Sequence, residues 1–536
     1  MPPAAARQAM QSSQTPLASL ARVIALGVLL IGSHLAAACS APPTATLPAS
    51  DSSPSPTSLP PTHPLPRAQQ TVLPTPTLTA EPPGTNLPHY TLQAELDYSR
   101  HFLQVAQTIA LFNPSSTPLA EVVLVVEPNR YPATFVLKSL VIADQDFKDQ
   151  VEWVQVNQLR VPLSKPWQPQ EKLELRLQYE LNLPSPQPSP TTRPVPFGWT
   201  DLQTNLVDWY PFVPPYREGS GWLAHPPGYF GEHLVLPAAD YEVTLRIREA
   251  VNVRSTASTD PIGEAVPGQL TLAASAPATE KDGAFHFSLS RARSFAWSVS
   301  HLYTLTMRQV GGITVYGYAF PAHRAAGEAA LNSTAQALDL YQRLFGALPR
   351  STLSVVEADF LDGMEYDGLV FLSKGFYNLY QGTPTEYLVA IAAHETAHQW
   401  WYALVGNDQA LEPWLDEALC TYSEKLYYEN FAPDALPWWL TYRIDFYQPS
   451  GWINGSIYDY TAFPNAYEAY RNAVYLNGAK FFEELRQALG DEAFFAFLRQ
   501  YAETHRHQIA STQGFFEQLQ AASTQDLTPV VQKYFR

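Results

Sequence analysis

The chain has 536 residues, of which 46% are hydrophobic and 12% aromatic, so large cores are available and global disorder is excluded. The formal net charge is −17, which leaves no general basic surface for a phosphate backbone, and we expect no nucleic-acid partner. Only two cysteines occur, which excludes a disulfide framework, and the length suits about two to four domains.

The amino-terminal segment predicts an export signal. Two arginines precede the apolar run Val23–Ile31, and small residues lead from that run to Cys39. This order is typical of a secretory signal, and the apolar run is too short to span a bilayer comfortably. The five residues that end at Cys39 resemble a bacterial lipoprotein signal, which predicts a signal peptide over residues 1–39 with lipid on Cys39. A plain secretory signal cut near Ala38, or an uncleaved anchor, is the alternative.

Residues 40–88 predict a disordered tether. They hold 14 of the 48 prolines, mixed with serine, threonine and alanine. Such a composition buries too little apolar surface to offset the entropy of ordering, so the segment stays extended. Together with lipid on Cys39, it predicts a cell-envelope lipoprotein whose folded part lies outside the cytoplasm.

Residues 89–300 predict an all-β domain. Apolar residues alternate with polar ones over Leu92–Tyr98, Leu173–Leu181 and Tyr241–Ile247, as expected for strands that bury one face. The proline-rich segment Leu183–Phe197 is expected to be a loop between them. No long helical pattern interrupts this part of the sequence.

Residues 301–536 predict a mostly helical domain that begins with strands. After a strand near Ile313–Phe320, the pattern favours a helix over His323–Phe345 and a strand over Leu353–Val356. Thr383, followed by Pro384 and Glu386, predicts a capped helix start, and we expect that helix to run to about Val405.

Within this helix the sequence is His394-Glu395-Thr396-Ala397-His398. Histidines four residues apart share one helix face, so both imidazoles can reach one zinc ion. The alternative is two histidines on an ordinary solvated or core face. A third ligand should come from a neighbouring helix, and Glu417 opens one; by itself, Glu417 would be interpreted as an acid that complements the helix dipole.

These motifs resemble the aminopeptidase N family of zinc metallopeptidases, gluzincins with the pattern HExxH, eighteen residues, then Glu. The motifs that carry the resemblance are His394–His398, Trp414–Ala418, Asp362–Tyr366, Tyr475–Ala479 and the segment Arg291–Ser298. The resemblance covers about residues 90–536. The resemblance implies an α+β multidomain protein with a saddle-like β domain followed by a thermolysin-like, mostly helical catalytic domain. It also implies a short form of the family, without the large carboxy-terminal helical domain.

The resemblance also implies roles for single residues. His394, His398 and Glu417 would hold one zinc ion, which activates water and polarises the scissile carbonyl. Glu395 would take the proton of that water and pass it to the leaving amine. Tyr475 would donate a hydrogen bond to the oxyanion, and the alternative for it is a buried core tyrosine.

Further residues follow from the same match. Glu365 would bind the free amine of the substrate, unless it is a solvated loop residue. Glu424, seven residues after Glu417, would support a ligand histidine or else lie on the surface. Cys420 could lie near the metal, although a small buried apolar residue is the simpler interpretation.

The sequence departs from the family at four places, and one of them is the usual Asn-Glu-Gly around the third ligand, which is Asp416-Glu417-Ala418 here. The asparagine of the Gly-x-Met-Glu-Asn motif is Tyr366, and the lysine after the catalytic tyrosine is Asn477. The amine-binding acid of the β domain is not identifiable within Gln203–Tyr210. None of these changes touches the zinc ligands, but each bears on strict aminopeptidase specificity.

We therefore expect an exported zinc metallopeptidase that removes amino-terminal residues from peptides. A zinc endopeptidase, or another zinc hydrolase on this fold, is the alternative enzyme. A non-catalytic extracellular binding protein is the alternative of another class, and the intact ligands, base and tyrosine argue against it. Side-chain preference, physiological substrate and oligomeric state are not determined by these residues.

Overall fold

The computed structural model describes residues 86–185, 196–248 and 252–536, all within one compact unit, Leu73–Arg536. The predicted signal over residues 1–39, its Cys39, and the tether up to residue 85 lie outside the described residues. Among the residues that are described, no helix has both the length and the hydropathy to cross a membrane.

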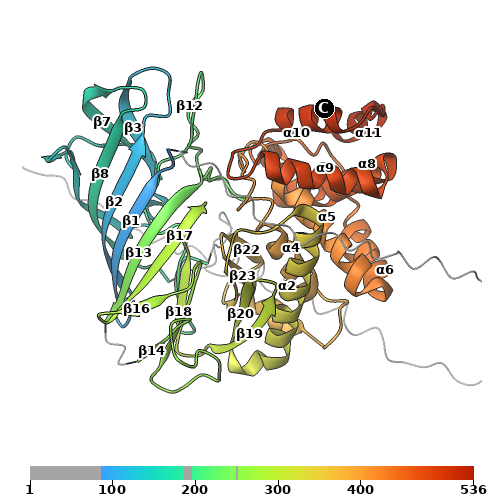
Figure 1. Ribbon diagram of the computed structural model, residues 1–536, viewed down its shortest axis with the longest axis horizontal. Coiled ribbons are helices and arrows are strands. Elements are labelled where there is room, and N and C mark those ends of the chain that lie inside the picture. Colours follow the sequence, from blue (N-terminus) through green and yellow to red (C-terminus); the bar gives the residue numbers. More distant parts are fainter. Residues whose placement is uncertain (1–85, 186–195, 249–251) are drawn as a thin grey trace, which may run out of the picture. The chain divides into compact units, whose positions relative to one another are not determined.

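The amino-terminal half is built on an eight-stranded sheet, drawn in blue to green in Figure 1. The order is β16-β17-β13-β1-β2-β8-β4-β5, and all neighbours are antiparallel except β1 and β13. Alternate residues of the long strands are buried, which confirms the expected period of two. The strands are β1 His89–Asp97, β2 Phe102–Phe112, β4 Phe135–Ile142, β5 Gln145–Asp146, β8 Lys172–Asn182, β13 Ala239–Arg248, β16 Thr279–Lys281 and β17 Ala284–Ala292.

Three smaller sheets complete this half. One has five strands, β14 Val253–Arg254, β15 Leu270–Ala274, β18 Trp297–Ser300, β10 Thr204–Leu206 and β9 Gly198–Trp199. One has three, β3 Leu119–Val125, β7 Gln158–Trp167 and β6 Glu152–Gln155, and one has two, β11 Tyr216–Arg217 and β12 Gly221–Trp222.

The second half opens with a five-stranded sheet in the order β19-β20-β21-β23-β22. Its strands are β19 Thr304–Val310, β20 Ile313–Ala319, β21 Thr352–Ala358, β23 Leu369–Ser373 and β22 Gly363–Tyr366. Every residue of β21 is buried, because the sheet is covered on both faces. Val355 packs into the core of the helices and Val356 into the core of the β domain, so this sheet joins the two halves.

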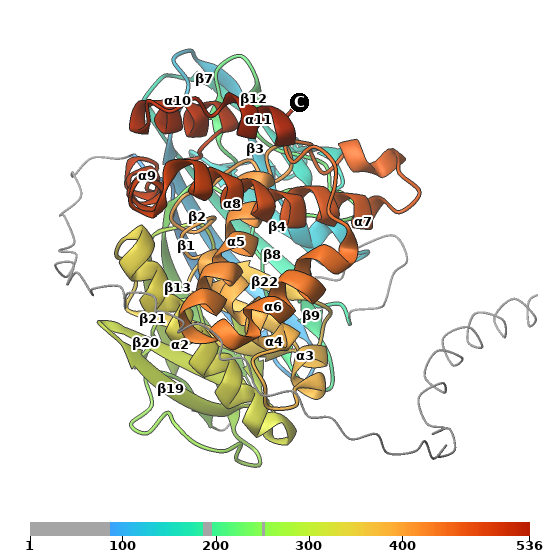
Figure 2. The same cartoon turned by 90° about the vertical axis from the view of Figure 1, so that its right-hand side faces the viewer.

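The rest of the chain is mostly helical, as predicted, and its later helices are red in Figure 2. The α-helices are α2 Arg324–Phe345, α3 Lys374–Leu379, α4 Tyr387–Ala397, α5 Trp414–Phe431, α6 Leu436–Trp438, α7 Ala466–Arg471, α8 Gly478–Leu489, α9 Asp491–Thr504, α10 Thr512–Ala522 and α11 Thr528–Tyr534. Two π-helical segments, Trp439–Ile444 and Asn472–Asn477, continue α6 and α7.

Helix α4 is shorter than the sequence predicted. It begins at Tyr387 because the carboxylate of Glu386 turns back to the backbone and hydroxyl of Thr383 and holds that segment outside the helix. It ends at Ala397, where His398 turns the chain into an irregular loop, so the expected continuation to Val405 is wrong.

Candidate metal centre

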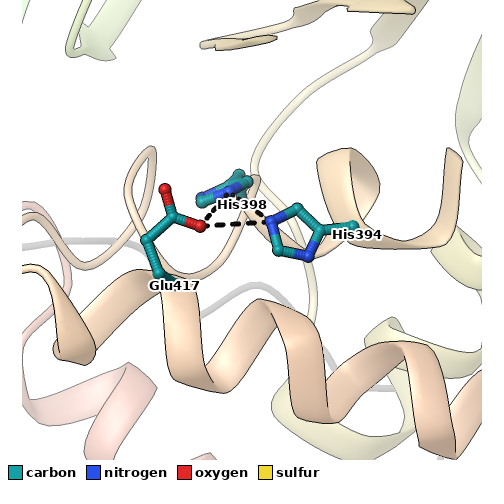
Figure 3. A group of neighbouring side chains, drawn as sticks. All are labelled: His394, His398 and Glu417. Carbon is teal, nitrogen blue, oxygen red and sulfur yellow. Dashed lines mark hydrogen bonds and ion pairs between the residues drawn. The ribbon is translucent and has the colours of Figure 1, made fainter. Parts of the chain in front are cut away.

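Two helices bring the predicted zinc ligands together. His394 and His398 leave the end of α4 on the same face, and Glu417 leaves the first turn of α5 opposite them. Figure 3 shows the Glu417 carboxylate directed at both imidazoles. His394 Nε2 lies 3.2 Å from Glu417 Oε2 and 3.2 Å from His398 Nε2. The third separation, from His398 Nε2 to Glu417 Oε2, is 3.6 Å.

These separations fit a metal ion. Tetrahedral zinc binds nitrogen and oxygen at about 2.0–2.1 Å, which places neighbouring ligand atoms about 3.3 Å apart. Two imidazoles and one carboxylate are also a ligand set of catalytic zinc, and they leave a fourth position for water. The residues present therefore fit one Zn²⁺.

Each histidine is oriented through its other ring nitrogen. Nδ1 of His394 lies 2.9 Å from Glu424 Oε1, and Nδ1 of His398 lies 3.0 Å from the carbonyl of Trp401. Both partners accept a hydrogen bond from the N–H at Nδ1, which directs each Nε2 towards the point where the ion would bind. Glu424 is itself held by the guanidinium of Arg443, at 2.7 and 2.9 Å, and by the indole of Trp439. The structure thus places Glu424 behind a ligand rather than on the surface.

The charges of His394, His398 and Glu417 favour a bound cation. Burial works against protonation of His394, but hydrogen bonds to Glu417 and Glu424 outweigh it and raise the pKa of His394 to about 9. Burial also disfavours the ionised Glu417, yet hydrogen bonds with the two histidines hold the pKa of its carboxyl well below the usual range. A buried carboxylate of this kind requires a positive partner, and a zinc ion supplies one without protonating the imidazoles.

Glu395 lies beside the ligands with one oxygen available. Within the described part of the chain, its Oε2 is buried and has no hydrogen-bond partner. Burial raises the pKa of Glu395 to about 8, against the opposing effect of the nearby histidines. A carboxylate whose pKa lies near neutrality can both accept and return a proton.

Tyr475 reaches the same point from the π-helical segment Asn472–Asn477. Its hydroxyl donates a hydrogen bond to Glu417 Oε1 at 2.6 Å, and its ring stacks on His394 with the centroids 6.0 Å apart. The alternative of a fully buried core tyrosine does not hold, because the ring lines the cleft and is only partly buried.

Glu365 comes from the edge strand β22. One of its carboxylate oxygens lies within 4.8 Å of ligand atoms of both Glu395 and His398, and Oε1 accepts a hydrogen bond from Gln409 at 3.1 Å. Its side chain is only 4% exposed, so it is not a solvated loop residue. Glu365 lines the cleft of about 320 Å³ that holds the metal ligands and also a smaller cavity of about 60 Å³ beside it.

The fold adds an acid that the sequence did not identify. Asp208 lines the smaller cavity together with Glu365, although more than 150 residues separate them in the sequence. Burial, followed by repulsion from Glu127 and Glu365, raises the pKa of Asp208 to about 7. Asp208 lies inside the segment Gln203–Tyr210 considered above, but only the fold places it with Glu365 in the wall of this cavity.

Cys420 is fully buried beside the site. Its sulfur lies 3.9 Å from the carbonyl of Trp401, the same oxygen that orients His398. Burial raises the pKa of the Cys420 thiol far above its usual value, so it stays protonated and packs as a small apolar side chain.

Known proteins match this chain at the level of family and fold. Residues 329–534 match the model of the peptidase family M1 domain. Aminopeptidase N of Lactobacillus helveticus is 25% identical over 280 residues, which are 48% of this chain and 32% of that protein. Aminopeptidase M1 of Arabidopsis thaliana is 26% identical over 238 residues, or 42% of this chain and 27% of that protein. The match therefore spans about a third or less of these relatives.

Solved structures extend the likeness to the β domain. The M1 zinc metallopeptidase of Deinococcus radiodurans superposes with a TM-score of 0.55 at 18% identity, covering 84% of this chain and 94% of that one. A mutant of that enzyme bound to a Tyr-Ser-Ala substrate gives a TM-score of 0.54 over the same shares. The order of a β domain followed by a helical catalytic region is thus shared along nearly the whole of that structure.

Proposed function

We propose that the protein is a zinc aminopeptidase that removes residues from the free amino termini of peptides, because residues 329–534 match the peptidase family M1 domain. The observation that carries the proposal is the placement of Glu365. Its carboxylate lies within 4.8 Å of ligand atoms of Glu395 and His398, close enough to hold a substrate amine next to the scissile bond.

The catalytic groups are arranged for hydrolysis of an amide. Bound zinc would polarise the scissile carbonyl and lower the pKa of a water molecule. Glu395 Oε2 accepts the proton of the attacking water and then returns it to the leaving nitrogen. The hydroxyl of Tyr475 donates to Glu417 Oε1, the oxygen that does not contact the histidines, and from there it would donate to the oxyanion of the tetrahedral intermediate.

Each of the two cavities would bind a different part of the substrate. An ammonium group bound at Glu365 directs its side chain into the smaller cavity and its carbonyl into the larger one, because Glu365 lines both. The smaller cavity has aromatic walls from Tyr131, Phe230 and Tyr366, with Asp208 among them. This supports a substrate that begins with a free amine and an apolar or aromatic residue.

Substitution of Glu365 tests this assignment. In the zinc-loaded protein, Glu365→Ala should lower kcat/KM for a leucine anilide at least tenfold, about 1.4 kcal/mol, because the buried ammonium loses its partner. The chelator phenanthroline should abolish turnover in both proteins, and added zinc should restore it. Turnover by Glu365→Ala within about twofold of the wild type would remove Glu365 from the amine site.

We further propose that the protein is exported and tethered to a membrane through lipid on Cys39. The support is the basic, apolar and small-residue order before Cys39 and the proline-rich segment that follows it. Mass spectrometry of the mature protein tests this proposal, and an unmodified Cys39 in the mature chain would refute it.

A further inference from the structure

One wall of the cleft is formed by three residues of a single helix face. Tyr467, Arg471 and Tyr475 follow each other at intervals of four along α7 and the π-helical segment that continues it, and all three line the cleft. Residues at this spacing stack along one helix face. Tyr475 contacts the metal ligand Glu417, so Arg471 lies about one turn further along the cleft.

Arg471 is held in place without an acidic partner. Its guanidinium carbon lies 4.0 Å from the centre of the Tyr447 ring, and Nε and Nη2 donate to the side-chain oxygen of Asn472 at 3.3 and 3.1 Å. Asn472 is fixed in turn, because its Nδ2 donates to the carbonyl of Tyr447 at 2.9 Å. Across the described ranges, no carboxylate forms an ion pair with Arg471.

Arg443, which also lines the cleft, has an acidic partner. Glu424, the acid that orients His394, forms a bidentate pair with the edge of the Arg443 guanidinium made by Nε and Nη2. Arg443 is therefore part of the support of the metal site. Arg471 is partly buried, and its charge is not neutralised by any acid in the described residues.

The contacts of Arg471 occupy only one of the two edges of its guanidinium. A guanidinium has two edges that can bind a carboxylate with two parallel hydrogen bonds. Asn472 takes the edge formed by Nε and Nη2, and the edge formed by Nη1 and Nη2 remains. The stack on Tyr447 keeps the guanidinium flat, so this edge is oriented before a ligand arrives.

We propose that Arg471 binds a carboxylate of the peptide on the leaving-group side of the scissile bond, an inference that rests on the proposed aminopeptidase function. Neighbouring positions on a helix face are about 6 Å apart, and an extended peptide advances about 3.3 Å per residue. The carboxylate therefore belongs to the second residue after the scissile bond. Two sources share this chemistry: the carboxy terminus of a tripeptide, or an acidic side chain in a longer peptide.

The substrate is then held at both ends. Glu365 takes the amine before the scissile bond and Arg471 takes the carboxylate after it, and both residues line the cleft that holds the metal ligands. The preferred substrates are therefore short peptides with two free ends. Peptides with an acidic residue at the second position after the scissile bond belong to the same class.

Paired substrates test the inference. The zinc-loaded wild type should hydrolyse Leu-Ala-Ala about tenfold better than its carboxy-terminal amide, measured as the ratio of kcat/KM values. The amide-capped pair Leu-Ala-Glu and Leu-Ala-Gln tests the side-chain source in the same way. Arg471→Gln should bring both ratios to about one, and Arg471→Lys should retain part of the preference. Any general loss of turnover cancels in these ratios.

The matched control is Lys480→Gln, which removes a positive charge from the same region by breaking the ion pair with Asp445. It should leave both ratios unchanged. Binding of Leu-Ala-Ala and its amide to Glu395→Gln protein, measured by calorimetry, gives a second readout that needs no turnover. There too, the free acid should bind more tightly, and the difference should vanish when Arg471→Gln is added.

The outcomes separate this inference from the proposed function. If the wild type hydrolyses all four peptides at equal rates, or if Arg471→Gln keeps the preference, the inference is wrong and the aminopeptidase remains. A preference for Leu-Ala-Ala alone identifies the carboxy terminus as the source, and a preference for Leu-Ala-Glu amide identifies the side chain. If the zinc-loaded protein hydrolyses none of the peptides and no leucine anilide, both proposals fail.

Discussion

At the scale of single residues, the chemistry depends on a carboxylate oxygen without a protein partner. Glu395 sits against Gly363 of β22 so closely that a Cβ at that position would lie 2.0 Å from Glu395 Oε1. The missing Cβ leaves room for Oε1, and Oε2 has no hydrogen-bond partner within the described part of the chain. A glycine at position 363 is therefore required by the position of Glu395, the proposed general base.

Glu395→Gln isolates the role of this oxygen. The amide has nearly the same shape but does not accept the proton of water, so kcat should fall about 10²–10⁴-fold. Zinc content and the thermal unfolding midpoint should stay unchanged, because Glu395 is not a ligand. His398→Ala is the contrasting variant and should lose zinc. Near-normal turnover of Glu395→Gln would remove Glu395 as the base.

The sequence predicted some of these residues and not others for a physical reason. Helix periodicity alone places His394 and His398 on one face, since the contact is local. Asp208 and Arg471 come from segments far from the zinc helix in the sequence, and only the fold brings them to its cavities. Their types and neighbours contain no periodic signal that identifies them.

At the scale of elements, a close helix crossing positions Tyr475. Gly478 begins α8 directly after the π-helical segment, and a Cβ there would lie 2.4 Å from the Cβ of Ala418 on α5. Two small residues let the helices approach until the Tyr475 hydroxyl reaches Glu417, one residue before Ala418. The glycine of the Tyr-x-Lys-Gly-Ala motif is thus a packing requirement.

Gly478→Ala tests this crossing because two effects oppose each other. Alanine favours a helix over glycine by about 1 kcal/mol, whereas overpacking a tight contact costs about 1–3 kcal/mol. We expect overpacking to win, lowering both stability and kcat as Tyr475 moves from Glu417. Gly490→Ala, where nothing lies within 4 Å, is the control for added volume, although its positive φ of 78° adds some strain. An unchanged kcat in Gly478→Ala would show that the crossing does not position Tyr475.

Helix boundaries illustrate where local patterns fail. The expected start at Thr383 used a capping box, and the carboxylate of Glu386 does bond to Thr383. The bond closes a turn before the helix instead of its first turn, so α4 begins at Tyr387. After its end at Ala397, the chain turns so that the Trp401 carbonyl accepts from His398 Nδ1, a contact that a sequence pattern does not show.

At the scale of the whole molecule, one buried arginine connects distant segments. The Arg293 guanidinium, from the end of the β domain, donates to the carbonyls of Tyr402, Leu404 and Gln508 and to that of Leu236. The first two carbonyls belong to the loop after the zinc helix. Arg293 therefore fixes that loop against both the β domain and the carboxy-terminal helices.

Arg293→Met should destabilise the protein by about 3–5 kcal/mol, because four carbonyls lose their buried donor. The urea midpoint of unfolding, followed by tryptophan fluorescence, measures the loss. Arg308→Met, which removes an exposed pair with Glu328, is the control and should change stability by less than about 1 kcal/mol. Equal midpoints for the two variants would contradict the role of Arg293.

The domain order was predictable because the period of the apolar pattern changes from two to that of a helix near residue 320. How the halves join was not predictable. The five-stranded sheet packs against two cores, and a continuous apolar strand such as β21 gives no indication of which partner covers which face.

The most direct test of the central claim compares one decapeptide with a free amino terminus and the same peptide acetylated. Mass spectrometry of both digests by the zinc-loaded protein should show stepwise loss of amino-terminal residues from the free peptide only. The acetylated peptide should stay intact, because its blocked nitrogen carries no charge for Glu365 to bind. Internal cleavage of both peptides at equal rates would contradict the aminopeptidase assignment and leave a zinc endopeptidase in its place.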